Sequence, residues 1–206
     1  MKKIPTLFER VYEGHKIVDI KNVITPGCEE ALARGIPTVK YDGSCCAIIN
    51  GQFYKRYDCK KGKTPPKGAI ACCDPDPITG HWPHWVMVNE NNPSDKWFIK
   101  AYRNSVRFIY AKLPDGTYEA VGQHFQGNPH QISYDTLLPH GKDAIEKLPR
   151  SFEFIRNYLE HTPIEGIVFW LDGEPICKIK RTDFGFEWPI RSTEGTDEHK
   201  HKHEYI

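Results

Sequence analysis

The stretch Val39-Lys40-Tyr41-Asp42-Gly43-Ser44 leads into the apolar run Cys45-Cys46-Ala47-Ile48-Ile49 and then into an Asn50-Gly51 turn. Lysine is normally a solvated ammonium, which is not a nucleophile. Partly desolvated beside other cations, its amine can lose the proton near neutral pH and attack phosphorus or carbon. Asp42 can orient such an amine, and Gly43 lets the backbone approach a bound ligand closely. A solvated lysine in a turn gives the same short pattern, so the motif indicates a reactive lysine only together with other residues.

Composition narrows the class of protein. The chain has 206 residues, enough for one large domain or two small ones, and Lys+Arg 28 nearly balance Asp+Glu 27. Binding of a polyanion therefore has to come from a local basic cluster. No stretch resembles a signal peptide or approaches the roughly 18 apolar residues of a membrane span. We expect no membrane contact and no obligate protein partner.

The cysteines predict neither a disulfide framework nor a zinc site by spacing. Their number, seven, is odd, two pairs are adjacent in sequence, and no Cys-x-x-Cys motif occurs. They are typical of small buried hydrophobic residues in a reducing compartment, so we expect a cytoplasmic protein.

Turn and capping signals predict the order of elements. Residues 4–24 suggest short strands, and Thr25-Pro26 suggests the N-cap and first turn of a helix that Gly35 ends. Asn50-Gly51 and Asp172-Gly173 each predict a β-hairpin.

The middle of the chain is less regular. The residues rich in proline and tryptophan, 64–93, suggest a packed aromatic loop, with His81 and His84 as a weaker metal-ligand alternative. Aromatic and branched residues between 97 and 110 suggest strands, and 117–122 suggests another strand. Ser151 begins a predicted helix with an apolar stripe formed by Phe154, Ile155, Tyr158 and Leu159.

Two groups of basic residues are candidate anion sites. The first is the densest basic cluster of the chain, Lys55, Arg56, Lys60, Lys61, Lys63 and Lys67. It is typical of either a solvated loop or a phosphate-backbone site, and the first hairpin returns Arg56 toward Lys40. The second is Lys178 and Lys180, which project from the same face of a strand. Two such lysines need an anion or guard an exposed sheet edge. Their partner strand, 167–171, is apolar throughout, which predicts cover on both faces.

The chain order of these features resembles the covalent nucleotidyltransferase superfamily of ATP-dependent ligases and mRNA capping enzymes. The features are Lys40-x-Asp42-Gly43, Arg56, Glu119, Glu165-Gly166-Ile167-Val168 and Lys178-x-Lys180. Further stretches look like the small family of 5′-to-3′ RNA ligases that includes a vertebrate RNA-repair ligase: Thr25-Pro26-Gly27-Cys28-Glu29, 76–83, Gly127-Asn128-Pro129 and Leu138-Pro139-His140-Gly141. This resemblance covers roughly residues 20–185.

The resemblance implies a role for each matching residue. Lys40 would attack the α-phosphate of ATP and form lysyl-AMP, while Lys178 and Lys180 neutralise the developing charge. Glu165 would bind Mg²⁺ (or Mn²⁺). The implied ATP-binding residues are Val39, Asp42, Gly43, Arg56, Glu119, His140, Ile167 and Val168. Among them, Arg56 would hold the ribose or an incoming 5′-phosphate, and Glu119 would accept a ribose hydroxyl. Ile167 or Val168 would form one wall against adenine, with His140 opposite. The implied nucleic-acid contacts are Lys55, Lys60, Lys61 and Lys63.

The implied fold is α+β. A nucleotidyltransferase (adenylation) domain at 1–190 would have antiparallel sheets forming an ATP cleft with flanking helices, followed by a polar, flexible tail at 191–206. No C-terminal OB domain is expected, because the chain ends about 26 residues after Lys180. The implied function is an ATP-dependent RNA ligase that joins 5′-phosphate and 3′-hydroxyl RNA ends through lysyl-AMP and an adenylated RNA end, as in RNA repair. The alternatives are a GTP-using capping-type guanylyltransferase or DNA ligase, and a non-catalytic nucleotide or RNA sensor.

Overall fold

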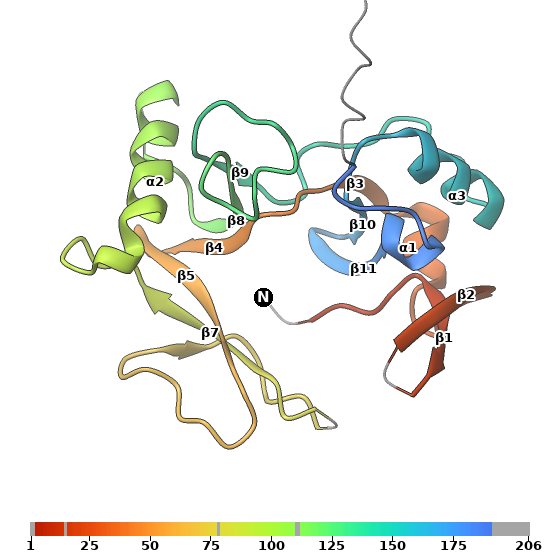
Figure 1. Cartoon of the computed structure of the whole chain (residues 1–206), viewed down its shortest axis with the longest axis horizontal. Helices are drawn as coiled ribbons and strands as arrows, with labels where there is room; N and C mark the ends of the chain where they lie inside the picture. Colours follow the sequence, from red (N-terminus) through yellow and green to blue (C-terminus); the bar gives the residue numbers. More distant parts are fainter. Residues whose placement is uncertain (1–2, 15, 78, 110–111, 191–206) are drawn as a thin grey trace, which may run out of the picture.

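The computed structural model of the chain describes residues 3–14, 16–77, 79–109 and 112–190. The predicted tail at 191–206 lies outside the described residues. Within them the fold is α+β, as expected, and all the paired strands run antiparallel (Figure 1).

Two sheets frame the centre of the molecule. The larger one has the order β6-β7-β5-β4-β8-β9, and the smaller has the order β11-β10-β3. The larger sheet is built from β4 (Ser44–Ile49), β5 (Gln52–Cys59), β6 (Ile70–Ala71), β7 (Trp82–Met87), β8 (Gly116–Val121) and β9 (Thr136–Pro139). The smaller is built from β3 (Ile36–Lys40), β10 (Gly166–Leu171) and β11 (Glu174–Lys180). A separate N-terminal hairpin consists of β1 (Phe8–Glu13) and β2 (Lys16–Ile24).

Both predicted turns are confirmed, because each contains a pair of residues that tolerates a left-handed backbone. Asn50 and Gly51 have φ of 50° and 71° between β4 and β5. Asp172 and Gly173 have φ of 51° and 84° between β10 and β11. Positive φ at both central positions matches the right-handed twist of the flanking strands.

The helices confirm some expectations and correct others. They are α1 (Glu29–Arg34), α2 (Lys96–Ile109) and α3 (Phe152–His161), with short 3₁₀ turns η1 (Pro93–Asp95) and η2 (Arg181–Phe184). As predicted, the Ser151 hydroxyl caps α3, accepting a hydrogen bond from the Phe154 N–H. The helix predicted from Thr25 begins at Glu29 instead, after a turn in which the Thr25 carbonyl accepts the Cys28 N–H. Phe154 is 59% exposed and lies outside the apolar stripe of α3, where Phe152 packs instead.

The strands predicted between 97 and 110 are wrong, because residues 97–109 belong to α2. Its apolar residues follow a helical spacing, and Trp97, Phe98, Ala101 and Tyr102 pack against one face of the larger sheet. Burial of this face outweighs the β-propensity of individual aromatic residues, which is itself largely a packing preference.

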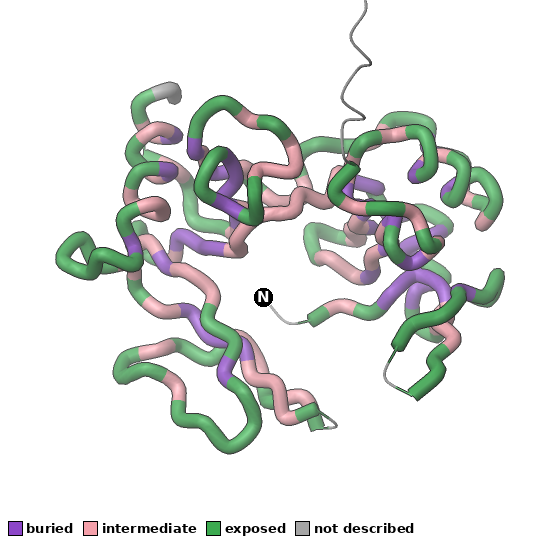
Figure 2. The backbone as a smooth tube through the Cα atoms, in the orientation of Figure 1, coloured by how far each residue is buried: buried purple, intermediate pink, exposed green. Residues whose placement is uncertain are grey.

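The buried residues of the described chain gather in three clusters, one beside the smaller sheet and two at the larger sheet (Figure 2). Beside the smaller sheet, Ile167, Phe169 and Ile179 pack with residues of α1 and α3. The expectation that 167–171 is covered on both faces holds fully for one face only, because Val168 and Trp170 point away from this core and are half-buried.

The chain crosses between the two sheets at 41–43, directly after Lys40 (Figure 1). A side chain at Gly43 would collide with the carbonyl oxygen of Ala120 on β8. Glycine is thus required here because the crossing segment packs tightly on β8. None of the helices in the described residues has the length and apolarity that crossing a bilayer requires.

Candidate active site

A pocket of about 220 Å³ lies between the two sheets and receives side chains from both. Among the described residues, four basic side chains line it, Lys3, Lys40, Arg56 and Lys178, together with one carboxylate, Glu119. Apolar surface comes from Ile4, Val39, Val168, Trp170 and Pro175. The excess of cations suits a polyanionic ligand, and the apolar wall suits a flat ring.

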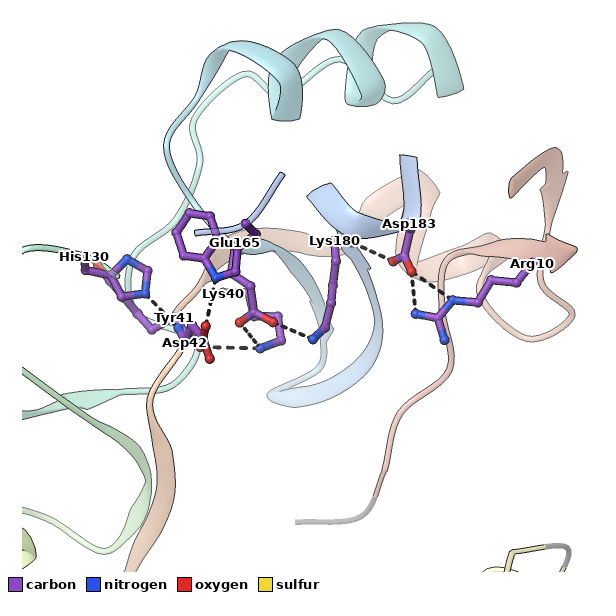
Figure 3. Close-up of polar contacts among 9 residues, drawn as sticks. Arg10, Lys40, Tyr41, Asp42, His130, Glu165, Lys180 and Asp183 are labelled. Atoms are coloured by element: carbon purple, nitrogen blue, oxygen red, sulfur yellow. Dashed lines mark hydrogen bonds and ion pairs between the residues drawn. The ribbon is translucent and has the colours of Figure 1, made fainter. Parts of the chain in front are cut away.

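Strand register brings the lysine motif and the acidic motif together. Gly166 at the start of β10 pairs with Lys40 on one side and with Lys180 on the other. The preceding residue, Glu165, is 4% exposed and lies between the two ammonium groups (Figure 3). One carboxylate oxygen pairs with Lys40 Nζ, and the other lies 2.5 Å from Lys180 Nζ. The buried carboxylate is thus compensated by two cations.

Lys178 is the third cation of this group. It lines the pocket, whereas its neighbours Cys177 and Ile179 are fully buried on the opposite face of β11. Lys178 and Lys180 therefore share a face, as predicted. Burial, followed by the nearby charges of Lys40 and Lys180, lowers the pKa of Lys178 from 10.5 to about 8. An anion in the pocket would relieve this local excess of positive charge.

Asp42 is held by residues that the sequence did not identify. Its backbone N–H donates to His130 Nε2 at 2.8 Å, and its carboxylate accepts from the Trp188 indole N–H at 2.8 Å. The His130 ring also packs edge-on against Tyr41. Burial is the main cause of the lowered pKa of His130. The lowered pKa favours the neutral imidazole, whose Nε2 can accept this hydrogen bond. The polar partners of Lys40 Nζ are the Glu165 carboxylate and the Tyr41 carbonyl (Figure 3). Asp42 instead holds the segment after the lysine in place, through its contacts with His130 and Trp188.

The larger sheet supplies hydrogen-bonding groups. Glu119 on β8 and His140 after β9 lie 2.9 Å apart, between Oε2 and Nε2. The other ring nitrogen of His140, Nδ1, lies 3.0 Å from the Thr117 hydroxyl. Arg56 on β5 reaches the pocket, as expected from the hairpin, and its Nε donates to Asp58 at 2.8 Å. Both proposed ligand-binding residues, Glu119 and His140, are therefore placed at the pocket.

The structure separates the two candidates for an adenine wall. Val168 lines the pocket, whereas Ile167 is completely buried in the core on the other face of β10. The alternative that used Ile167 is corrected accordingly, since neighbouring residues of a strand point to opposite faces. Trp170 lines the same wall and was missed, although its spacing of two from Val168 could have indicated it. Gly141 lies against its ring, where a Cβ would come within 2.9 Å.

The predicted basic cluster is divided by the fold. Lys60, Lys61 and Lys63 are exposed in the loop after β5, as an RNA-binding loop would require. Lys55 instead forms an ion pair with the buried Asp95, at the N-terminal end of α2. This pair neutralises Lys55 and argues against a phosphate contact there.

A second group of exposed basic residues lies on α2, and the strand prediction for this segment did not reveal it. Lys96, Lys100, Arg103 and Arg107 are spaced four, three and four residues apart and are all exposed. This spacing places them along one side of the helix. Trp97 stacks on His124 beside them, with the ammonium of Lys96 4.5 Å from the Trp97 ring. Once the segment is assigned as helix, the stripe is evident from the sequence.

The donor set at Glu165 is of the type that Mg²⁺ prefers, because carboxylate oxygen is its usual protein ligand. In this structure both oxygens of Glu165 are paired with lysines, so a divalent cation has to replace at least one ammonium contact. Modification of the Lys40 amine would remove one of these charges. The Glu165 carboxylate would therefore fit a metal better if the Lys40 ammonium were neutralised.

Comparison with known proteins adds evidence on family. No family model matches the chain. The chain is 23% identical over 253 aligned positions to RNA ligase 1 of Pongo abelii, with 90% of this chain and 78% of that protein covered. It is 27% identical over 142 positions to RNA ligase 1 of Danio rerio, covering 55% of this chain and 44% of that protein. The chain thus spans less than half of the Danio rerio protein. Both matches support a family relationship between this chain and the RNA ligases.

Proposed function

We propose that the chain is an ATP-dependent RNA ligase that joins 5′-phosphate and 3′-hydroxyl RNA ends, in RNA repair, through a lysyl-AMP intermediate. The observation that carries this proposal is the position of Lys40, at a pocket lined by four basic side chains and one carboxylate. A nucleoside triphosphate has the charge to match this lining. Two relatives with the name RNA ligase 1 support RNA as the second substrate.

The first step would transfer AMP to Lys40. The ammonium has to lose a proton before it attacks, and Glu165 is the carboxylate in contact with it. The amine then forms a bond to the α-phosphorus while the bond to the pyrophosphate oxygen breaks. Lys178 at the pocket and Lys180 behind it are fixed cations that stabilise the charge developing on the phosphate.

The nucleotide itself would be held from both sheets. Glu119 accepts a ribose hydroxyl, and the half-buried Val168 packs against the base. Arg56 holds the ribose or the incoming 5′-phosphate. When bound, Mg²⁺ supplies additional charge neutralisation at the phosphates, with Glu165 as its candidate ligand on this chain.

Two further transfers would complete the reaction. AMP passes from Lys40 to the 5′-phosphate of RNA, which breaks the phosphorus–nitrogen bond and restores the amine. The 3′-hydroxyl of the second RNA end then attacks the activated phosphate, loses its proton and expels AMP. These steps need positioning and charge rather than recognition of particular bases.

Intact-mass measurement after incubation with Mg²⁺ and either ATP or GTP tests the proposal. We expect a mass increase of one AMP with ATP, through a bond that acid cleaves. Subsequent addition of RNA with 5′-phosphate and 3′-hydroxyl ends should discharge the AMP and yield joined product. An adduct formed only with GTP would favour a capping-type guanylyltransferase instead. If DNA ends are joined and RNA ends are not, the chain is a DNA ligase, and absence of any adduct leaves a nucleotide sensor.

A further inference from the structure

Three potential metal ligands meet on the wall of the pocket formed by the larger sheet. Cys45, Glu119 and His140 each offer one ligand atom, and these atoms all lie within 4.8 Å of one another. Cys45 and Glu119 are direct cross-strand partners on β4 and β8, so their side chains leave the same face of the sheet. The His140 backbone N–H donates to the Thr117 carbonyl, which ties the residue after β9 to the same strand.

The chemistry of this set differs from that of the Glu165 region. Sulfur, imidazole nitrogen and carboxylate oxygen are the usual ligands of Zn²⁺, with bonds of roughly 2.0–2.3 Å. Tetrahedral corners at such distances lie roughly 3–4 Å apart, so small side-chain movements would close the observed cluster around an ion. A thiolate among the ligands favours zinc or a similar metal over magnesium.

The orientation of His140 supports a metal role. Its Nδ1 lies 3.0 Å from the Thr117 hydroxyl, and its Nε2 lies 2.9 Å from Glu119 Oε2. A partner on one ring nitrogen that directs the other nitrogen toward the ion is the usual arrangement around metal-bound histidine. All three residues also line the pocket, so a fourth position would remain open to water or to a ligand.

We propose that Cys45, Glu119 and His140 form a binding site for Zn²⁺, and that the bound ion excludes nucleotide from the pocket. Binding displaces the thiol proton of Cys45 and forms a metal–sulfur bond. The metal site itself does not depend on the proposed ligase activity. The exclusion of nucleotide does rest on it, because Glu119 and His140 are the residues proposed to meet the ribose and the base.

Titration with Co²⁺, a coloured substitute for zinc, tests the site directly. A sulfur-to-cobalt charge-transfer band appears only when cysteine is a ligand. We expect the band to saturate at one cobalt per chain and to disappear when Zn²⁺ is added. Cys45→Ser should abolish the band. Cys73→Ser is the matched control, since Cys73 is also half-buried but does not line the pocket, and it should keep the band. A band that persists in Cys45→Ser, or no band in the unmodified protein, overturns the site.

A second variant guards against misfolding. His140→Gln keeps a hydrogen-bonding side chain but removes the strong nitrogen ligand, so cobalt affinity should fall by at least roughly 10-fold. Unchanged affinity in His140→Gln contradicts the assignment even if Cys45→Ser fails to fold. Circular dichroism of each variant establishes whether the fold is retained.

Exclusion of nucleotide is tested on the covalent form. Protein that carries AMP, verified by mass, should give no cobalt band, because the ribose would occupy Glu119. Failure to form the adduct refutes the proposed function and leaves the cobalt result on the free protein intact. An adduct that still gives the full band refutes the exclusion.

Discussion

The two sheets that form the pocket contribute different kinds of groups. The smaller sheet supplies charge, because Lys40 and Lys180 pair with the buried carboxylate of Glu165 and Lys178 adds a third cation nearby. The larger sheet supplies side chains that are already paired, with Glu119 on His140 and Arg56 on Asp58. The first arrangement suits a change in charge at phosphorus, and the second suits recognition of a neutral sugar and base. We therefore expect substitutions on the smaller sheet to reduce the rate of the chemical step, and those on the larger sheet to weaken binding.

The largest effect should follow from Lys40→Arg. Arginine keeps the positive charge but does not lose its proton in proteins, so the AMP adduct should fall below detection by intact mass. Lys21→Arg, an exposed position on β2, is the control and should form the adduct normally. If the Lys40→Arg protein still carries AMP, Lys40 is not the nucleophile and its assignment on the smaller sheet is wrong.

Alanine at Lys178 or Lys180 should reduce the rate of adduct formation by roughly 10²-fold or more, since each removes a fixed cation from the proposed phosphate site. Ile179→Val lies between them and faces the core, where Ile179 is fully buried. It should instead lower the free energy of unfolding by about 1 kcal/mol and leave the rate almost unchanged. Single-turnover kinetics and urea unfolding measure the two quantities. Equal, small effects at the three positions would mean that these lysines merely protect an edge strand.

The exposed loop lysines should affect RNA and not ATP. Removing one lysine–phosphate interaction lowers the salt slope of single-strand binding by roughly 0.7, so replacing Lys60, Lys61 and Lys63 by alanine should flatten the slope by about 2. Raising the salt from 50 mM to 200 mM reduces the joining rate of both proteins. The factor of reduction should be on the order of 10 times smaller for the variant than for the unmodified protein. Adduct yield should hardly change, because the charges in the pocket are screened less.

The comparison for this variant is the α2 surface. A Lys96→Ala, Arg107→Ala double variant, which keeps the ion pair of Lys100 with the buried Asp135, tests whether that helix carries the phosphate contacts instead. If the double variant flattens the salt dependence of joining and the loop variant does not, RNA binds at α2, on the face of the larger sheet that this helix covers. If the loop variant loses the adduct, its lysines serve the ATP site or the fold.

How far the sequence could predict this arrangement depends on the range of each interaction. The hairpins at Asn50-Gly51 and Asp172-Gly173 were predictable because the turn is decided by its own two residues. Lys178 and Lys180 share a face because a strand has a period of two. Position 167 could not be separated from 168 in this way, because which face meets the core depends on α1 and α3.

Sequence spacing gave little information where distant residues decide the outcome. Lys55 belongs to a basic cluster in sequence, but its partner Asp95 comes from the segment before α2. His130 and Trp188 reach Asp42 from two distant parts of the chain, so local spacing gave no signal for them. Cysteine spacing gave no signal for the proposed zinc site, because its three candidate ligands lie on separate strands or loops and meet only in the folded sheet.

The smallest effect should distinguish Lys178 from Lys180 by pH. Burial and neighbouring cations lower the pKa of Lys178 to about 8, whereas the unfolded chain keeps a value near 10.5. Its charged form therefore destabilises the fold fully below about pH 8, and the penalty disappears as pH rises to about 10.5. Lys178→Met removes the penalty and should raise the free energy of unfolding by about 1–2 kcal/mol at pH 7, with a gain that shrinks between pH 8 and pH 10.5.

Lys180→Met is the matched control for this experiment. It breaks the ion pair with Glu165 and leaves this buried carboxylate with one cation fewer, so it should destabilise the protein at pH 7. Urea unfolding of both variants across this pH range, without nucleotide, measures the difference. A gain for Lys178→Met that does not vary with pH would mean that its side chain is limited by packing rather than by charge. A gain that vanishes above pH 10 would show that the smaller sheet holds its third cation at a cost in stability, which a bound phosphate would offset.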